Sequence, residues 1–187
     1  MTAAVTREWN SGSASLRPFI PSDAGAYLYF ATERESSLSW RHRGTTPSAD
    51  QMLGSLWTGA EVVLVGSVSG KVVGFYVLYD VDYRNAHGYV AVLQDPALSG
   101  LGGAFGPLAL FLDYVFGEFP FVKLYFMSDE VAAARYASSV TSGLLTDEAR
   151  FRGHFQHEQG VFSDCYVRAL RRETWIVSRF SEHSNDG

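Results

Sequence analysis

The sequence contains little cysteine, few basic residues and no long apolar run. Its 187 residues include one cysteine, Cys165, so an internal disulfide and a cysteine-based metal cluster are both excluded for a single chain. Acidic residues number 20 against 15 lysines and arginines, and the formal net charge of −5 argues against nucleic-acid binding. No stretch of about 18 uncharged apolar residues occurs, and residues 1–15 lack the apolar core of a secretion signal. We therefore expect a cytoplasmic protein without a membrane span and without bound metal.

The composition is that of a folded domain with an unusual share of aromatic residues. Hydrophobic residues make up 47% of the chain, charged residues 19% and aromatic residues 14%, and the aromatic share suits strands and a lined pocket. This length is enough for one domain with a hydrophobic core and short for two. Small polar residues at both ends predict loose termini. We therefore expect one domain at residues 13–178, with a flexible N-terminus at 1–12 and a flexible tail at 179–187.

Strand-like runs and helical patterns alternate along the chain and predict an α+β protein around one sheet. The expected strands lie at 15–19, 61–66, 72–79, 87–94, 121–127, 150–155 and 161–170. The expected helices lie at 24–32, 49–58, 105–116 and 129–142, with N-caps at Ser22, at Ser48 and at Ser128 or Asp129. Turns are expected at 69–71 and 80–85, and a loop at 35–47. The densest basic group is expected to be a solvated strand edge; it consists of Arg168, Arg171 and Arg172.

A glycine cluster stands between the strand at 87–94 and the apolar helix at 105–116. It reads Ser99-Gly100-Leu101-Gly102-Gly103-Ala104. Such a strand–loop–helix junction points backbone N–H groups and a helix N-terminus at one spot, so it predicts an anion site. A glycine-rich turn needed only for tight packing of the strand against the helix is the alternative.

Several separated segments resemble the GNAT superfamily of N-acetyltransferases, and within it the branch of the ribosomal-protein N-terminal acetyltransferases. The resemblance covers roughly residues 14–175 and depends on the order and spacing of the segments. These segments are Leu16-Arg17-Pro18 followed by Ser22-Asp23-Ala24, then Gly70-Lys71-Val72-Val73-Gly74-Phe75, the glycine cluster, and the tail pieces 148–154, 160–164 and 170–175.

The resemblance implies a fold and an activity. The fold is a mixed, mostly antiparallel central sheet flanked by helices in three α/β/α layers. The activity is transfer of an acetyl group from acetyl-CoA to a primary amine by direct attack. Family members hold the CoA pyrophosphate on a loop written Gln/Arg-x-x-Gly-x-Gly/Ala. Because Ser99 stands at the first position, either CoA binding is weakened or the acyl donor differs. The implied cofactor-binding residues are Val92, Leu93 and Gln94 on the strand and Ser99, Gly100, Leu101, Gly102, Gly103 and Ala104 in the loop.

The residue that accepts the ammonium proton is left open. Asp80, Asp82 and His87 cluster with Tyr83 at the turn before the strand that leads to the glycine loop, where a substrate ammonium could be met. Histidine has a pKa suited to proton transfer near neutrality. The alternative is that the two aspartates stabilise a turn, a common role of aspartate.

Tyr136 is the candidate acid that protonates the leaving thiolate. The resemblance implies a tyrosine on the helix after the fifth strand, but counting back from Gly143 places Ser139 at that position. Tyr136 lies about one helical turn away on nearly the same face. Packing of this ring, with water protonating the thiolate, is the alternative.

The acceptor site is the least defined part of the prediction. Trp40 and Arg41 in the loop between the first two helices, and His154 in the final hairpin, are the candidates. Cys165 is expected to be a small buried side chain rather than a nucleophile. The acceptor is a small-molecule amine or a protein N-terminus, and a homodimer is an open option. Two rival functions remain, namely a non-catalytic CoA-binding module and a transferase that takes its acyl group from a carrier protein.

Overall fold

One sheet organises the molecule. In the computed structural model, the described residues are 7–32, 48–98, 105–158 and 160–183. Within them, eight strands form a sheet of order β1-β2-β3-β4-β5-β6-β8-β7, antiparallel throughout except for the parallel pair β5–β6. The strands are β1 (Trp9–Ser11), β2 (Ala14–Pro18), β3 (Ala60–Val68), β4 (Lys71–Asp82), β5 (His87–Gln94), β6 (Lys123–Ser128), β7 (Thr146–Glu158) and β8 (Val161–Arg171).

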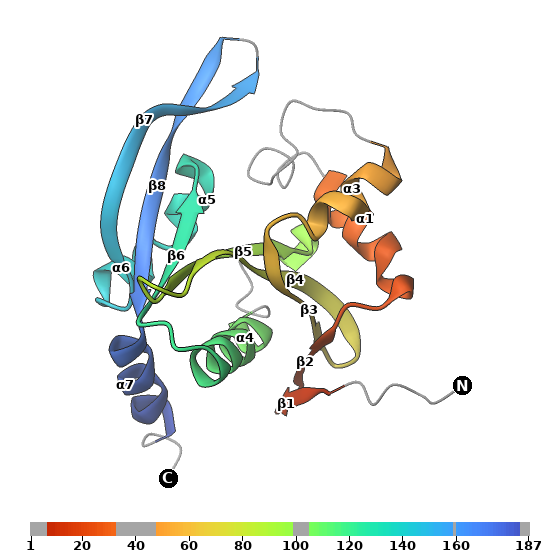
Figure 1. Cartoon of the computed structure of the whole chain (residues 1–187), viewed down its shortest axis with the longest axis horizontal. Coiled ribbons are helices and arrows are strands. Elements are labelled where there is room, and N and C mark those ends of the chain that lie inside the picture. The colour runs from red at the N-terminus through yellow and green to blue at the C-terminus, as the bar shows by residue number, and fades with distance from the viewer. Residues whose placement is uncertain (1–6, 33–47, 99–104, 159, 184–187) are drawn as a thin grey trace.

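Helices cover both faces of this sheet (Figure 1). The 3-10 turn η1 (Pro21–Asp23), α1 (Ala24–Thr32) and α3 (Ala49–Leu56) lie on one side, and α4 (Phe105–Glu118) and α7 (Arg172–His183) on the other. Three short segments, η2 (Pro96–Leu98), α5 (Glu130–Arg135) and α6 (Ala137–Thr141), follow the ends of β5 and β6. This confirms the predicted mixed, mostly antiparallel sheet in three α/β/α layers.

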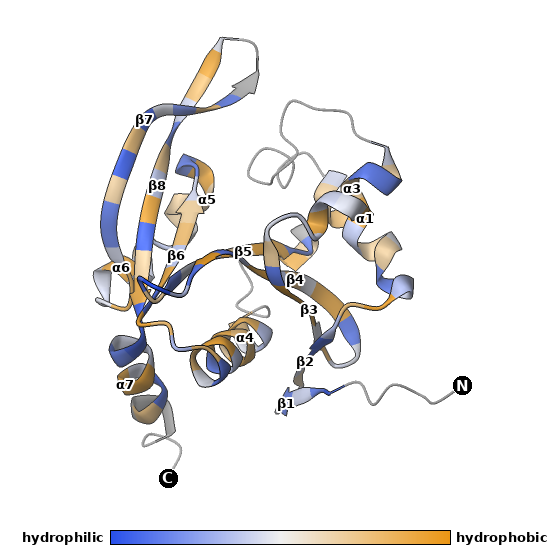
Figure 2. Cartoon of the chain, viewed as in Figure 1, coloured by the Kyte–Doolittle hydropathy of each residue, from blue (hydrophilic) through white to orange (hydrophobic). Residues whose placement is uncertain are grey.

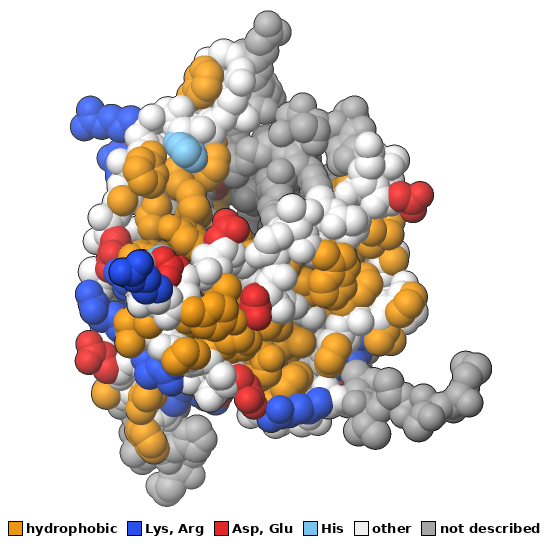
Figure 3. All heavy atoms as spheres, in the orientation of Figure 1, with side chains coloured by type: hydrophobic (Ala, Val, Ile, Leu, Met, Phe, Trp, Pro, Cys, Tyr) orange, Lys and Arg blue, Asp and Glu red, His pale blue; other side chains and the backbone are white. Residues whose placement is uncertain are grey.

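Two hydrophobic clusters form because side chains alternate between the faces of a strand. On β4, Tyr76 and Leu78 join the cluster under α4, whereas Phe75 and Val77 join the cluster under α1 and α3. The middle strands are therefore buried on both faces and carry mostly hydrophobic residues (Figure 2). Figure 3 shows hydrophobic side chains gathered in a band across the middle of the visible face.

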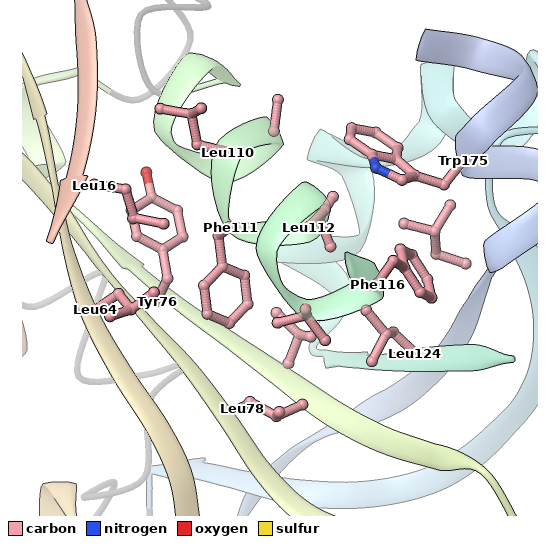
Figure 4. Close-up of a cluster of buried hydrophobic side chains, with 14 of the residues drawn as sticks. Leu16, Leu64, Tyr76, Leu78, Leu110, Phe111, Leu112, Phe116, Leu124 and Trp175 are labelled. Carbon is pink, nitrogen blue, oxygen red and sulfur yellow. The ribbon is translucent and has the colours of Figure 1, made fainter. Parts of the chain in front are cut away.

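Helix α4 is the crossover between the parallel strands β5 and β6, and it packs closely on the sheet. Figure 4 shows its apolar side chains between Tyr76 of β4 and Trp175 of α7. The rings of Phe111 and Tyr76 lie 5.8 Å apart. The close approach depends on Gly66 of β3, where an added Cβ would lie 2.5 Å from the Cβ of Pro107. The first turn of α4 therefore rests directly on the backbone of β3.

Several local predictions are confirmed. Ser48 caps α3, with its Oγ accepting from the N–H of Gln51 while the Gln51 side chain accepts from the N–H of Ser48. The hairpin between β3 and β4 turns through Ser69 and Gly70, both at positive φ, as a two-residue primed turn requires. Cys165 is fully buried.

The predicted cap at Ser22 is wrong. The helical segment begins earlier, with η1, and Ile20 stands at its N-cap. The carboxylate of Asp23, the third residue of η1, accepts from the N–H of Ile20 at 2.8 Å and from both terminal nitrogens of Arg17 at 2.7 Å. The bond to Ile20 is the return bond of a capping box. Within the segment expected to be loose, Trp9–Ser11 form the edge strand β1, which pairs with β2.

Several predicted boundaries also differ, and β7 spans Thr146–Glu158 rather than 150–155. Strand β4 continues to Asp82 through a bulge in which Asp80 has a φ of 46°, so the turn begins later than expected. The helix expected at 129–142 divides at Tyr136 into α5 and α6. Of the two predicted caps, Asp129 is the correct one, because its Oδ1 accepts from the N–H of Ala132 at 2.8 Å.

The basic group near the C-terminus is not a solvated edge. Arg168 is 7% exposed, pairs with Asp147 at 2.7 Å and donates to the carbonyl of Ala133. Arg172 donates to backbone carbonyls at and just beyond the C-terminal end of α4, where a cation satisfies unpaired carbonyl groups. Arg171 is the exposed member.

The last helix extends into the tail that was expected to be flexible. Residues 179–183 belong to α7, which is joined to α4 because Asp113 accepts from Trp175 Nε1 at 2.8 Å and from Arg179 at 3.0 Å. Among the described residues, no helix is long and apolar enough to cross a membrane.

Candidate active site

The parallel strands β5 and β6 separate near the middle of the sheet. Their pairing runs from His87 with Lys123 to Val90 with Phe126 and then ends among the described strands, although both strands continue. We call this divergence the splay; it consists of residues 91–94 of β5 and 127–128 of β6. Figure 1 shows β6 turning away from β5, with α4 beside the opening.

The phase of the β4–β5 ladder decides which backbone groups face the splay. The N–H of Asp95 donates to the carbonyl of Val73 at 2.9 Å, and the register pairs Phe75 with Leu93. Backbone groups on successive residues of a strand point to opposite sides, so odd-numbered residues of β5 bond to β4. Val92 and Gln94 therefore direct N–H and C=O groups into the splay. The backbone of Leu93 faces β4 instead, and its side chain is buried under α1 and α3.

The path from β5 to α4 is anchored at its two ends. Asp95 is 4% exposed and accepts from Lys71 Nζ and from the N–H of Ala97, both at 3.0 Å. These two bonds hold the chain as it leaves the sheet. At the other end, Pro107 in the first turn of α4 packs against the backbone of Gly66. The predicted anion loop, 99–104, lies between these anchors and outside the described residues. The first N–H groups of α4 and its positive dipole end lie next to that loop.

Tyr76 lies under this helix start and was missed by the sequence prediction. Its ring is fully buried and close to two glycines: an added Cβ would lie 2.5 Å from the ring at Gly66 and 3.1 Å from the hydroxyl at Gly74. The hydroxyl shares a hydrogen bond with the Gln94 side chain, and burial raises the pKa of Tyr76 far above its ordinary value. The sequence signal that could have found Tyr76 is the presence of Gly74 on its own strand and of Gly66 on the neighbouring strand.

Tyr136 and Ser128 lie on the β6 side of the splay. Tyr136, at the break between α5 and α6, is half-buried with its ring 6.0 Å from that of Phe126. Its nearness adds to the effect of burial in raising the pKa of Tyr76. Ser128 ends β6 and is 6% exposed, and its Oγ finds no hydrogen-bond partner among the described residues. A buried hydroxyl without a partner is unusual, because nearly all buried polar groups are hydrogen-bonded.

The predicted bases are not brought to the splay. Asp82 accepts from both the N–H and the side-chain amide of Asn85, and these bonds lower the pKa of Asp82 while holding a turn. His87 opens β5, four residues before Ala91, which is about 13 Å along a strand. Asp80 is exposed at the bulge of β4.

The acceptor candidates are also separated from the splay or lie outside the described residues. His154 is exposed on β7, with its ring 4.9 Å from that of Phe155. Trp40 and Arg41 belong to the part of the chain that the structure does not describe. Of the predicted site residues, the structure thus gathers Val92, Gln94 and Tyr136, and adds Tyr76 and Ser128.

Comparisons with known proteins identify the fold. No protein-family model matches the sequence, and no curated protein matches it. Among solved structures, the chain is similar to spermidine N-acetyltransferase from Vibrio cholerae in complex with CoA and spermine, with a TM-score of 0.76, 17% identity, and coverage of 89% of this chain and 99% of that one. It is also similar to a probable GNAT-family acetyltransferase from Chromobacterium violaceum, with a TM-score of 0.69, 18% identity, and coverage of 89% and 86%. The chain therefore has the fold of the GNAT acetyltransferases.

Proposed function

We propose that the protein is an N-acyltransferase that transfers an acetyl group from acetyl-CoA to a primary amine. The observation that carries the proposal is the splay, where Val92 and Gln94 present backbone groups on the strand that leads to α4. Within the described part of the chain, β6 has separated from β5 at these residues, so their groups on that side have no strand partner. A backbone group without a partner is costly unless water or a ligand satisfies it. The fold shared with acetyltransferases supports the same activity.

The residues present fit the acyl donor. Its pantetheine arm carries amides that can pair with Val92 and Gln94 as an added strand would. Its pyrophosphate suits the start of α4 and the glycine loop, through N–H groups and the helix dipole. The Oγ of Ser128, which has no partner among the described residues, is available for a hydrogen bond to a polar group of the donor other than the amides and the pyrophosphate.

The chemistry requires little more than positioning and proton transfer. The amine nitrogen forms the new C–N bond as the thioester C–S bond breaks; the amine loses one proton and the thiolate gains one. Backbone N–H groups in the splay can hold the carbonyl oxygen as negative charge develops on it. Tyr136 is the proposed donor of the thiolate proton, because it lies between α5 and α6 beyond the end of β6, with its ring 6.0 Å from that of Phe126. Water takes the ammonium proton, since Asp82 is engaged in its turn.

Replacement of Gly102 tests the donor site. Gly102→Val should abolish CoA binding if backbone N–H groups of the loop contact the pyrophosphate. Gly117→Val is the matched control, because Gly117 lies in the last turns of α4 and an added Cβ there meets no atom within 4 Å. Calorimetric titration with CoA measures the affinity of both variants. Unchanged affinity in the Gly102 variant would remove the glycine loop from the proposed site.

A thiol-release assay with acetyl-CoA and a panel of amines separates the rival functions. Turnover of any amine supports the transferase. CoA binding without turnover would favour the non-catalytic module, and turnover with an acylated carrier protein alone would favour that donor. Including a peptide with a free N-terminus tests the narrower assignment to the ribosomal-protein branch.

A further inference from the structure

Four aromatic rings form a continuous strip on the sheet face opposite α4. Tyr79 of β4, His87 and Tyr89 of β5 and Tyr125 of β6 are half-buried. The ring of Tyr89 lies 5.7 Å from that of Tyr79 and 5.1 Å from that of Tyr125, and His87 meets Tyr125 edge-on at 5.4 Å. We call these four residues the aromatic strip. Its members keep partly exposed ring surface that another ring can contact, since offset-stacked and edge-to-face arrangements are both favourable.

The strip ends at the splay. Tyr89 and Tyr125 are register partners, and the next residues on the same face are Ala91 and Met127, where β5 and β6 have already separated. The two-residue step from Tyr89 to Ala91 is about 6.6 Å. A molecule lying on the strip therefore reaches the splay from the face opposite α4. The donor site proposed above lies on the α4 side, so direct attack brings the acceptor from the strip side.

The charges beside Tyr125 are already paired. Lys123 lies 4.6 Å from the centre of the Tyr125 ring and pairs with Glu148 at 3.0 Å. Two further carboxylates of β7 and β8 are bound by arginines, Asp147 by Arg168 at 2.7 Å and Asp164 by Arg150 at 2.5 Å. A polyamine needs several carboxylates that it can neutralise, whereas an aromatic ring needs apolar surface. The strip therefore suits a ring.

We propose that the aromatic strip binds the ring of an arylalkylamine, whose amino group reaches the splay through a short linker. This inference rests on the proposed transferase function and names its substrate class. It differs from the polyamine present in the complex of the Vibrio cholerae enzyme. Asp80 lies beyond Tyr79, at the end of the strip away from the splay. Replacing Asp80 therefore distinguishes a polyamine substrate from an arylalkylamine substrate.

The first test is binding without the acyl donor. Titration of the wild-type protein with phenethylamine, tyramine or tryptamine, followed by NMR, should shift the ring resonances of Tyr89 and Tyr125 but not those of Tyr83. Tyr83 is a matched control because its ring packs on Phe121 and its hydroxyl donates to Glu61. Absence of shifts at Tyr89 and Tyr125 would overturn the inference whatever the protein catalyses.

The second test is turnover. Ring-bearing amines should have a higher kcat/KM than spermidine or putrescine. Tyr89→Leu and Tyr125→Leu should each raise KM for the ring amine up to about tenfold with kcat little changed, as loss of an aromatic pair predicts, while Tyr83→Leu leaves KM unchanged. If the wild-type protein prefers polyamines and the Asp80→Asn variant shows a weaker preference for them, the inference is contradicted. Ring binding without turnover of any amine would contradict the transferase and leave the strip as a ring-binding site.

Discussion

At the scale of single residues, Ser128 is the most unusual polar group in the described part of the chain. Its hydroxyl is buried at the end of β6 without a partner, on a strand whose even-numbered side chains face α4. Its neighbour Asp129 is also buried, but that carboxylate caps α5. The sequence suggested both residues as caps and could not assign one of them to a site, because a cap and a ligand contact use the same residue type.

Replacing Ser128 separates a ligand contact from a structural role. Ser128→Ala should leave the free energy of unfolding without CoA unchanged or raise it by up to about 1 kcal/mol, since an unpaired buried hydroxyl is removed. CoA affinity should fall several-fold because the hydrogen bond to the ligand is lost. Thermal unfolding with and without CoA, together with titration, measures both effects.

Ser48→Ala is the comparison for this variant. Its hydroxyl accepts from the N–H of Gln51, so the change should cost about 1 kcal/mol of stability without altering CoA affinity. Loss of stability in the Ser128 variant, with affinity intact, would show that Ser128 is structural.

At the scale of elements, the sequence predicts clearly that α4 is a helix but does not predict how closely this helix approaches the sheet. An almost uniformly apolar segment with proline in its first turn predicts a buried helix, and α4 is buried as expected. How closely it approaches the sheet depends on Gly66, more than 40 residues away in sequence. No local pattern reveals which glycine of a strand lies under a helix, because the contact is made only after the strands have paired.

Gly66→Ala tests this contact. The added methyl group would lie 2.5 Å from both Pro107 and the Tyr76 ring, so the start of α4 must shift. We expect a loss of about 1–3 kcal/mol in the free energy of unfolding, as overpacking costs, and weaker CoA binding. Urea unfolding measures the change in the free energy of unfolding, and titration with CoA measures the change in affinity.

Gly54→Ala provides the control for this helix–sheet contact. Gly54 lies in α3 with no atom within 4 Å of an added Cβ, so alanine should stabilise the helix by about 0.5–1 kcal/mol. Equal effects of the two substitutions would mean that the contact at Gly66 does not position α4.

At the scale of the whole molecule, the ion pair between Arg17 and Asp23 joins β2 to the 3-10 turn η1 and makes the free energy of unfolding depend on pH in the acid range. Burial opposes ionisation of Asp23, but hydrogen bonds from Arg17 and from the N–H of Ile20 outweigh it and lower the pKa of Asp23. A folded-state pKa below the unfolded value near 3.8 means that this stabilisation is present above that pH. It is lost as the pH falls through the lowered pKa.

Asp23→Asn should therefore lower the free energy of unfolding at neutral pH by about 2 kcal/mol, the size of hydrogen bonds to a charged group. The difference between variant and wild type should shrink as the pH falls below 3.8. Glu118→Gln, which breaks an exposed pair with Arg7, should change little at any pH. Thermal unfolding across the acid range measures all three proteins, and a pH-independent difference for the Asp23 variant would contradict the linkage.

The sequence by itself determined most of the elements from β2 to β8, the α+β class and the location of the glycine loop, because strand patterns, caps and glycines act over a few residues. It did not reveal β1 or α7. Tertiary structure alone decided that β5 and β6 separate after Val90, that Val92 and Gln94 face the opening, and that Tyr76 supports the helix beside it. It also buried Arg168 and directed the half-buried Arg172 to the carbonyl groups at the end of α4. The physical reason is that a backbone direction or an ion pair depends on which distant strand lies alongside, and pairing between strands is not encoded in the spacing within either one.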